Sequence, residues 1–184
     1  MKKTSIVIIA IVVLVLLYGW STYNRLVTGR ENADNQWAQV ETQYQRRFDL
    51  IPNLVESVKG IMKQEQEVFK AIADARTRYS GASSVDAKAA AATQVEGALG
   101  RLLVVMENYP QLKSAENVQT LMAQLEGTEN RVSVERKRFN DMVRDFNLAT
   151  KRFPSSLVAS MFGFAERSYF EAAPGTEAAP KVQL

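Results

Sequence analysis

Hydrophobic residues dominate the beginning of the chain. After Lys2 and Lys3, residues 4–24 carry no charge and consist largely of Ile, Val and Leu. A helix of about 20 apolar residues is long enough to span the hydrocarbon core of a bilayer. The pattern therefore predicts a transmembrane signal anchor over residues 1–24.

A cleaved secretory signal is the alternative to this anchor. Its apolar region would be about 7 to 15 residues long and would end at a small-x-small site. Residues 20–24 read Trp-Ser-Thr-Tyr-Asn, which is a poor cleavage site. The chain also has no cysteine for lipid attachment. We therefore favour the uncleaved anchor.

The orientation of the anchor depends on its flanking charges, because Lys and Arg are enriched in cytoplasmic flanks. Lys2 and Lys3 precede the apolar run, and Arg25 and Arg30 follow it. The count is tied, but the lysines adjoin the run and the α-amino group adds a third positive charge. We expect a cytoplasmic N-terminus with the domain on the other side.

From Leu26 to Phe153 the apolar residues recur at helical spacing. The first repeat advances in steps of three and four, which is typical of bundle and coiled-coil helices. Its positions are Leu26, Arg30, Ala33, Trp37, Val40, Tyr44 and Phe48. Asp49 suits a helix start and Pro52 suits a first turn. These two residues predict a break near Arg47–Asp49.

Three further helical stretches follow this predicted break. The second runs to Tyr79, and the loop at residues 80–84 precedes a third helix capped by Ser84 or Asp86. Pro110 ends the third helix. Ser114 is expected to cap a fourth helix, which Pro154 ends. On the third, Gly97 and Gly100 are expected to let a neighbouring backbone come close. No β-type alternation of useful length occurs.

The expected fold class is all-α, with an N-terminal single transmembrane helix followed by an antiparallel up-and-down four-helix bundle. The bundle is assigned to residues 25–153. Residues 154–171 form a short apolar segment. Residues 172–184 have the composition of a disordered tail.

The apolar segment after Pro154 has two interpretations. The fourth helix of an up-and-down bundle runs back towards the bilayer, so residues 155–164 either lie at the membrane surface or fold over the open end of the bundle. Aromatic rings favour the headgroup level. The candidate membrane-interface residues are Trp20, Tyr23, Phe162 and Phe164.

Composition limits the chemistry of the chain. It has no His and no Cys, which excludes Ser-His and Cys-His nucleophiles and zinc sites of ordinary ligation. No phosphate-binding glycine loop or calcium loop is present. Outside Lys2 and Lys3 the charges nearly balance, so nucleic acid is not an expected partner. We expect no enzyme activity, no cofactor and no metal.

Six segments carry a resemblance that covers nearly the whole chain. They are residues 23–27, 46–55, 107–112, 128–131, 139–140 with 146–147, and 153–154 with 162–164. The run from Arg47 to Val55 is the most specific. In these segments the chain resembles the LemA family. Lys137 stands where that family usually has Arg, and Glu135 where it more often has a small residue.

The resemblance implies a single membrane helix, a four-helix bundle and residence in the bacterial inner (cytoplasmic) membrane. It implies no activity, because the biochemical role of the family is not established. Family members are often encoded near membrane proteases or TPM-domain proteins. This association suggests a link to membrane protein quality control in the cell envelope.

Polar residues within the strongly helical stretches are the candidate site. They are Arg47, Asp49, Asn53, Glu129, Asn130, Arg131, Asn140 and Asn147. A buried polar network that fixes helix register is the favoured interpretation. A polar groove for a peptide or partner helix is the functional alternative, and a catalytic or metal role the least favoured. Matched charge predicts that Arg47 pairs with Glu129.

Together these features predict a membrane-anchored helical scaffold or partner-binding protein. The expected partners are the lipid bilayer and another envelope protein, or a second copy in a homo-oligomer. The alternative is an envelope sensory or ligand-binding helical bundle.

Overall fold

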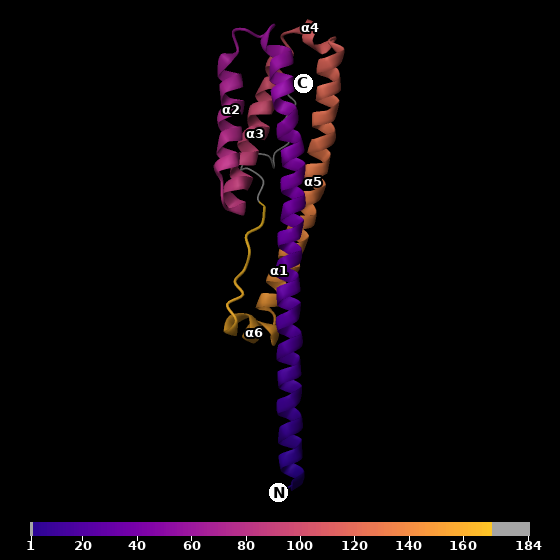
Figure 1. Ribbon diagram of the computed structural model, residues 1–184, viewed down its shortest axis with the longest axis vertical. Helices are drawn as coiled ribbons and strands as arrows, with labels where there is room; N and C mark the ends of the chain where they lie inside the picture. Colours follow the sequence, from indigo (N-terminus) through magenta and orange to yellow (C-terminus); the bar gives the residue numbers. More distant parts are fainter. Residues whose placement is uncertain (1, 171–184) are drawn as a thin grey trace, which may run out of the picture. The chain divides into compact units, whose positions relative to one another are not determined.

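The computed structural model describes residues 2–170, and every regular element within them is helical. No strand occurs in that range. Figure 1 shows six helices: α1 (Lys2–Lys59), α2 (Gln66–Gly81), α3 (Val85–Met106), α4 (Pro110–Lys113), α5 (Glu116–Lys151) and α6 (Ser155–Met161). The expected all-α class is therefore confirmed. The predicted tail, residues 172–184, lies outside the described residues.

The chain divides into two compact units. Unit 1 comprises residues 1–39 and 137–169, and unit 2 comprises residues 40–136 and 170–184. Helices α1 and α5 each contribute one segment to unit 1 and another to unit 2. The predicted end of the anchor at residue 24 and the predicted end of the bundle at residue 153 stay predictions.

Helix α1 is continuous from Lys2 to Lys59, so the predicted break near Arg47–Asp49 is wrong. Pro52 lies inside the helix. A proline in a helix interior costs about 3 kcal/mol. The apolar repeat nevertheless continues through it, because Phe48, Ile51 and Leu54 are all buried. Each such side chain contributes about 1.5–3 kcal/mol, which outweighs the cost of Pro52.

The turn that the sequence placed near Arg47 occurs instead at residues 60–65. Lys63 to Glu67 are all polar, so the apolar repeat that holds α1 in the core stops there. Met62 is fully buried, and its N–H donates to the carbonyl of Val58 at 2.9 Å. The predicted second helix is thereby split between the end of α1 and α2.

Unit 2 is built around one buried face of each long helical segment. Helices α2 and α3 pack side by side after a three-residue connection (Figure 1). Ser84 caps α3, as expected, because its Oγ accepts a hydrogen bond from the N–H of Ala87 at 3.1 Å. The buried apolar residues include Tyr44, Ile72, Val95, Leu99, Leu102, Leu112, Val118, Leu125 and Val132.

Two smaller predictions about this region are wrong. A Cβ added at Gly97 or Gly100 would meet nothing within 4 Å, so no neighbouring backbone approaches either glycine. Ser114 does not cap α5. Its hydroxyl donates instead to the carbonyl of Gln111 at 3.2 Å, at the end of α4.

Unit 1 joins the part of α1 before residue 40 to the end of α5 and to α6. Leu26, Phe146 and Ala159 form a buried cluster, with Val158 and Phe164 packed against it. A Cβ at Gly29 would lie only 3.3 Å from Cδ2 of Phe146, so this glycine permits close helix packing. Trp37 and Phe139 add a ring contact with centroids 5.3 Å apart.

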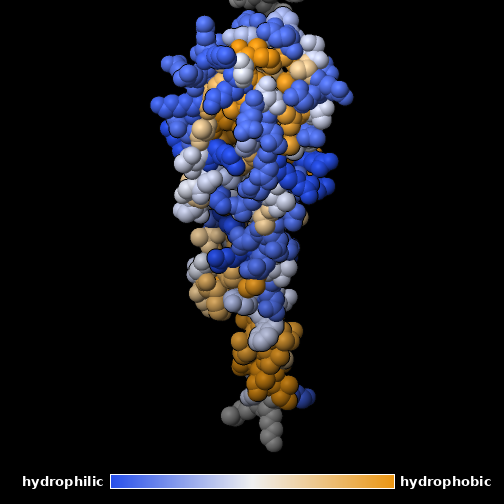
Figure 2. All heavy atoms as spheres, turned by 45° about the horizontal axis from the view of Figure 1, so that its top comes forward, coloured by the Kyte–Doolittle hydropathy of each residue, from blue (hydrophilic) through white to orange (hydrophobic). Residues whose placement is uncertain are grey.

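No described residue covers the most apolar part of α1. None of its most apolar 18-residue window is buried, whereas 44% of the corresponding window of α3, the other sufficiently apolar helix, is buried. Helix α3 therefore belongs to the core of unit 2. In Figure 2 the bare stretch of α1 is the continuous orange segment near the grey N-terminal end. Its exposure fits the apolar anchor predicted from the sequence.

Candidate functional site: a charged cluster and an apolar groove in unit 2

Five polar side chains meet inside unit 2. We call them the charged cluster: Tyr44, Arg47, Glu96, Glu129 and Arg136. They come from α1, α3 and α5. Two guanidinium groups face two carboxylates, so the formal charge of the cluster is balanced.

The predicted pair of Arg47 and Glu129 is present, with Nη1 of Arg47 bound to Oε2 of Glu129. Arg47 lies within α1 rather than at a turn. Its side chain is 91% buried, and Nη1 also donates to the carbonyl of Leu125 at 3.5 Å. Its Nε has no hydrogen-bond partner among the described residues. Arg47 is thus held at its tip, while its inner nitrogen is left without a partner.

Arg136 links the two carboxylates. Its Nη2 lies 3.1 Å from Oε1 of Glu96 and 3.3 Å from Oε1 of Glu129. The guanidinium also lies 5.0 Å from the ring centroid of Phe170, a cation–π distance. Arg136 therefore connects α3 to α5 and helps to hold Phe170.

The carboxyl of Glu96 is partly buried within the charged cluster. Burial raises the pKa of Glu96, although Arg136 and the hydrogen bond from Tyr44 act in the opposite direction. The hydroxyl of Tyr44 donates to Oε1 of Glu96 at 3.0 Å. Burial also raises the pKa of Tyr44, and Glu96 reinforces that effect. Tyr44 therefore stays protonated as a donor.

An open groove of about 670 Å³ lies beside the cluster. Its walls are mainly apolar and come chiefly from α3, α4 and α5, with Arg47 of α1 at one part. Arg47 and Glu129 line one part of it, and the carboxylates of Glu107 and Glu126 are exposed on its lining. The apolar lining residues are Leu99, Leu103, Met106, Leu112, Val118, Met122, Ala123 and Leu125. Figure 2 shows hydrophobic side chains between hydrophilic ones on the face of unit 2 turned to the viewer.

Four predicted site residues lie outside the charged cluster, on the surface. Asp49, Asn53, Asn130 and Arg131 are all exposed. Asp49 accepts a hydrogen bond from Gln45 at 2.8 Å, and the backbone carbonyl of Asn53 accepts one from Ser57 at 2.8 Å. These are local contacts within α1.

The two remaining predicted residues belong to unit 1. Asn140 is half-buried and Asn147 is buried. Nδ2 of Asn147 donates to the carbonyl of Arg167 at 2.9 Å, and Oδ1 accepts from the N–H of Arg167 at 2.9 Å. Arg167 in turn binds Asp34 of α1 through Nη2 at 2.5 Å. Asn147 thus fixes the segment that follows α6.

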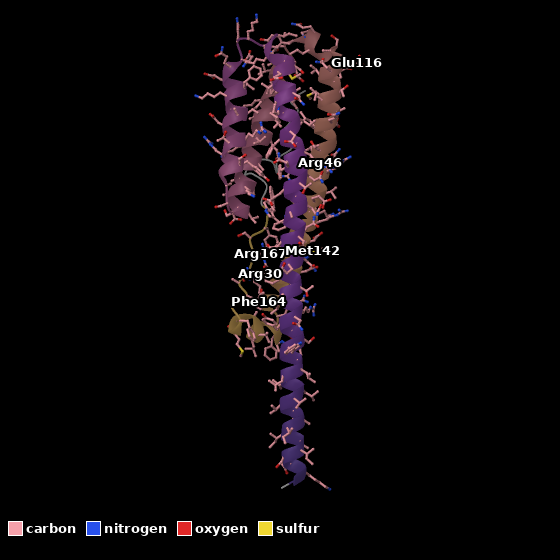
Figure 3. All side chains as sticks on the ribbon, viewed as in Figure 1. Arg30, Arg46, Glu116, Met142, Phe164 and Arg167 are labelled. Carbon is pink, nitrogen blue, oxygen red and sulfur yellow. The ribbon has the colours of Figure 1, made fainter. Side chains whose placement is uncertain are left out.

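A small pocket of about 260 Å³ adjoins this contact in unit 1. Arg30, Asp34, Phe164 and Arg167 contribute to its lining. Figure 3 labels Arg30, Phe164 and Arg167 in this part of the unit. Since Asp34 and Arg167 bind each other, the charges of this pocket are partly satisfied.

Three of the four candidate membrane-interface residues come together. The ring of Tyr23 lies 4.9 Å from that of Phe162 and 5.8 Å from that of Phe164, between centroids. Trp20 stands apart and is 75% exposed. The segment after Pro154 therefore contacts α1 directly after the bare apolar stretch.

Tyr44, Glu96 and Arg136 were not predicted as site residues. The available signal was an acidic side chain on the alanine-rich helix α3, next to the buried Val95. Arg136 is seven residues from Glu129 on α5, and this spacing does bring the two together.

These features define a membrane-associated helical protein. The LemA family model matches residues 36–184, and the chain belongs to this family. Magnetosome protein MamQ of Magnetospirillum gryphiswaldense is 27% identical over an alignment of 178 residues, gaps included; the match covers 83% of this chain and 65% of MamQ. MamQ 1 and MamQ 2 of Paramagnetospirillum magneticum are 25% identical over the same shares. The matched region is thus just under two thirds of these relatives.

Proposed function

We propose that this protein is a membrane-anchored helical scaffold that binds another envelope protein through unit 2. The observation that carries the proposal is the contrast along α1. Its N-terminal stretch is bare and apolar, whereas Val40, Tyr44, Phe48 and Leu54 of the same helix are buried in unit 2. One helix therefore belongs both to a lipid-compatible segment and to a packed polar domain.

Two finer features belong to the same proposal. The segments of α1, α2, α3 and α5 in unit 2 act as an antiparallel up-and-down four-helix bundle. This is supported by contacts such as Tyr44 with Tyr79 and Glu96 with Arg136. The N-terminus is cytoplasmic and the domain lies on the outer face of the bacterial inner membrane, supported by Lys2 and Lys3 before the anchor.

The groove of unit 2 is the proposed partner site, and its occupant is a basic amphipathic helix. Apolar grooves commonly take the apolar face of such a helix. Glu107 and Glu126 are exposed on the lining, and neither forms a salt bridge within the described part of the chain. Arg47, the one cation among the lining residues that the structure describes, already binds Glu129. The free charge of the groove is therefore negative, which favours Lys or Arg on the partner.

Photo-cross-linking in intact membranes tests this function. A photoreactive residue at Leu103, which lines the groove, should give a discrete product. The same residue at Val134, which is exposed on α5 but does not line the groove, is the control. The double substitution Glu107→Lys with Glu126→Lys should abolish the Leu103 product. In the wild type, the partner peptide cross-linked at Leu103 should be basic and amphipathic. Equal products from both positions, or no effect of charge reversal, would count against the site.

A ligand-binding sensory bundle is the second candidate. The groove volume falls within the usual range of small-molecule sites. The buried Nε of Arg47, which has no partner among the described residues, is a donor for an anionic group. Decanoate, with an apolar tail and a carboxylate, is a suitable probe. A saturable rise in the melting temperature with decanoate, absent in Leu103→Asp, would favour the sensory bundle over the scaffold.

An enzyme is the least supported reading. We propose that unit 2 catalyses no reaction, since the charged cluster pairs each carboxylate with a guanidinium group. Turnover of peptides, glycans or phosphoesters that is lost in Glu129→Gln would overturn this view.

A further inference from the structure

One apolar surface of unit 1 is left uncovered by the described chain. From Phe153 to Ala165 the sequence has no charged residue. Ala159 of α6 packs into the cluster of Leu26 and Phe146, and Val158 contacts its edge. The other side of the segment has no such cover.

The uncovered residues are large and strongly exposed. Phe153 is 81% exposed, Leu157 61%, Met161 77% and Phe162 57%. Leu157 and Met161 are four residues apart on α6 and therefore share one helix face. A cluster of this kind on a protein surface marks an interaction site.

The position of these exposed residues relative to α1 indicates what covers them. Phe162 touches Tyr23, which lies six residues after Leu17, the last aliphatic residue of the bare stretch. At 1.5 Å per residue these positions are only about 9 Å apart along α1. Trp20, between them, is also exposed. Unit 1 therefore holds α6 at the level where the anchor leaves the hydrocarbon core.

We propose that α6 and its flanks form a membrane-interfacial foot, in which Phe153, Leu157, Met161 and Phe162 insert among the lipid headgroups beside Trp20. Interfacial helices bury an apolar face about 5–10 Å into the boundary of headgroups and acyl chains. The ring of Phe164 contacts those of Tyr23 and Phe146, and these contacts join the foot to α1 and α5. The inference rests on the proposed membrane anchor and adds a second, peripheral contact that fixes unit 1 against the bilayer.

Spin labelling of the full chain in vesicles tests the foot. The chain has no cysteine, so each introduced cysteine gives one labelled site. Leu157→Cys and Met161→Cys report on the foot, Ile11→Cys on the anchor, and the exposed Ser133→Cys on unit 2. Collision with oxygen reports an apolar surrounding, and collision with a water-soluble nickel chelate reports an aqueous one. Vesicles of phosphatidylcholine, with and without phosphatidylglycerol, supply the bilayer.

We expect the oxygen-to-nickel accessibility ratio at Leu157→Cys and Met161→Cys to exceed that at Ser133→Cys several-fold in both kinds of vesicle. If the ratio at Leu157→Cys and Met161→Cys equals that at Ser133→Cys while the ratio at Ile11→Cys is high, the foot is overturned and the anchor is not. An aqueous Ile11→Cys overturns the anchor itself. Spin–spin broadening at Met161→Cys that disappears on dilution with unlabelled protein, without a raised ratio, assigns the surface to a second copy and overturns the proposal.

Discussion

Asn147 and Arg167 are joined by two hydrogen bonds of 2.9 Å, in which one carboxamide satisfies both the N–H and the carbonyl of one backbone residue. Asn147 is buried near the end of α5, and Arg167 lies in the irregular segment after α6. An irregular segment has no helical partners for its backbone, so a side chain must supply them. This contact explains why an amide occupies a core position in α5.

Replacing Asn147 by alanine should loosen this segment. Two hydrogen bonds are lost at about 1 kcal/mol each, so we expect unit 1 to lose about 2 kcal/mol of stability. Hydrogen exchange at the amide of Arg167 should accelerate by more than tenfold. The exposed Asn130 supplies the control, because Asn130→Ala should change neither quantity. Unchanged exchange at Arg167 in Asn147→Ala would show that the clamp does not hold the segment.

Replacing Arg47 by alanine should destabilise unit 2. Glu129 loses its principal partner and keeps only Arg136, at 3.3 Å. Because Glu129 is partly exposed, water compensates in part, and we expect a loss of about 2 kcal/mol in the free energy of unfolding by urea.

The neighbouring Arg46 provides a matched control for Arg47. Arg46 is exposed on the same helix and is labelled in Figure 3. Arg46→Ala should change the free energy of unfolding by less than about 0.5 kcal/mol. Equal effects of the two substitutions would mean that the charged cluster adds nothing specific to stability.

The helical glycines should respond to alanine in two ways. Gly97 and Gly100 have open space around an added Cβ, so Gly97→Ala and Gly100→Ala should each stabilise unit 2 by about 0.5–1 kcal/mol. At Gly29 the added methyl meets Phe146 at 3.3 Å, so Gly29→Ala should gain less or lose stability. Thermal unfolding of the three variants orders them directly. A gain at Gly29 equal to that at Gly97 would contradict the close packing in unit 1.

The raised pKa of Glu96 makes stability depend on pH. Burial lets the folded chain keep the Glu96 proton to a higher pH than the unfolded chain, whose Glu pKa is about 4.3. Between the two pKa values the folded state binds more protons, so the free energy of unfolding falls as pH rises. Glu96→Gln removes this titration. Its stability relative to the wild type should therefore rise with pH from about 4.3 upwards.

Urea unfolding measured from pH 4 to pH 8 checks this dependence. Glu126→Gln, which replaces an exposed carboxyl outside the charged cluster, is the matched variant, and the pH dependence of Glu96→Gln should exceed any that it shows. A constant offset between Glu96→Gln and the wild type would rule out Glu96 as the source of the pH dependence.

Local sequence patterns predicted correctly that these segments are helical, but they predicted less well where the helices begin and end. The repeat through Trp37, Val40 and Tyr44 marks residues that are indeed buried. Pro52 and Asp49 suggested a break because each favours a helix start when considered locally. The break is absent because the burial of Phe48 and Ile51 outweighs those local preferences, and only the packed structure reveals that balance.

The sequence by itself determined the apolar N-terminal stretch and the all-α class, because hydrophobic periodicity is a local property. Matched charge suggested the pair of Arg47 and Glu129, but these residues lie on α1 and α5, and only the packing of the two helices brings them together. The tertiary structure decided that Tyr44, Glu96 and Arg136 complete the charged cluster and that Asn147 holds Arg167. It also brought Tyr23 against Phe164 and left Leu157 and Met161 exposed. These contacts join residues far apart in sequence, so they depend on which faces of α1, α3 and α5 meet.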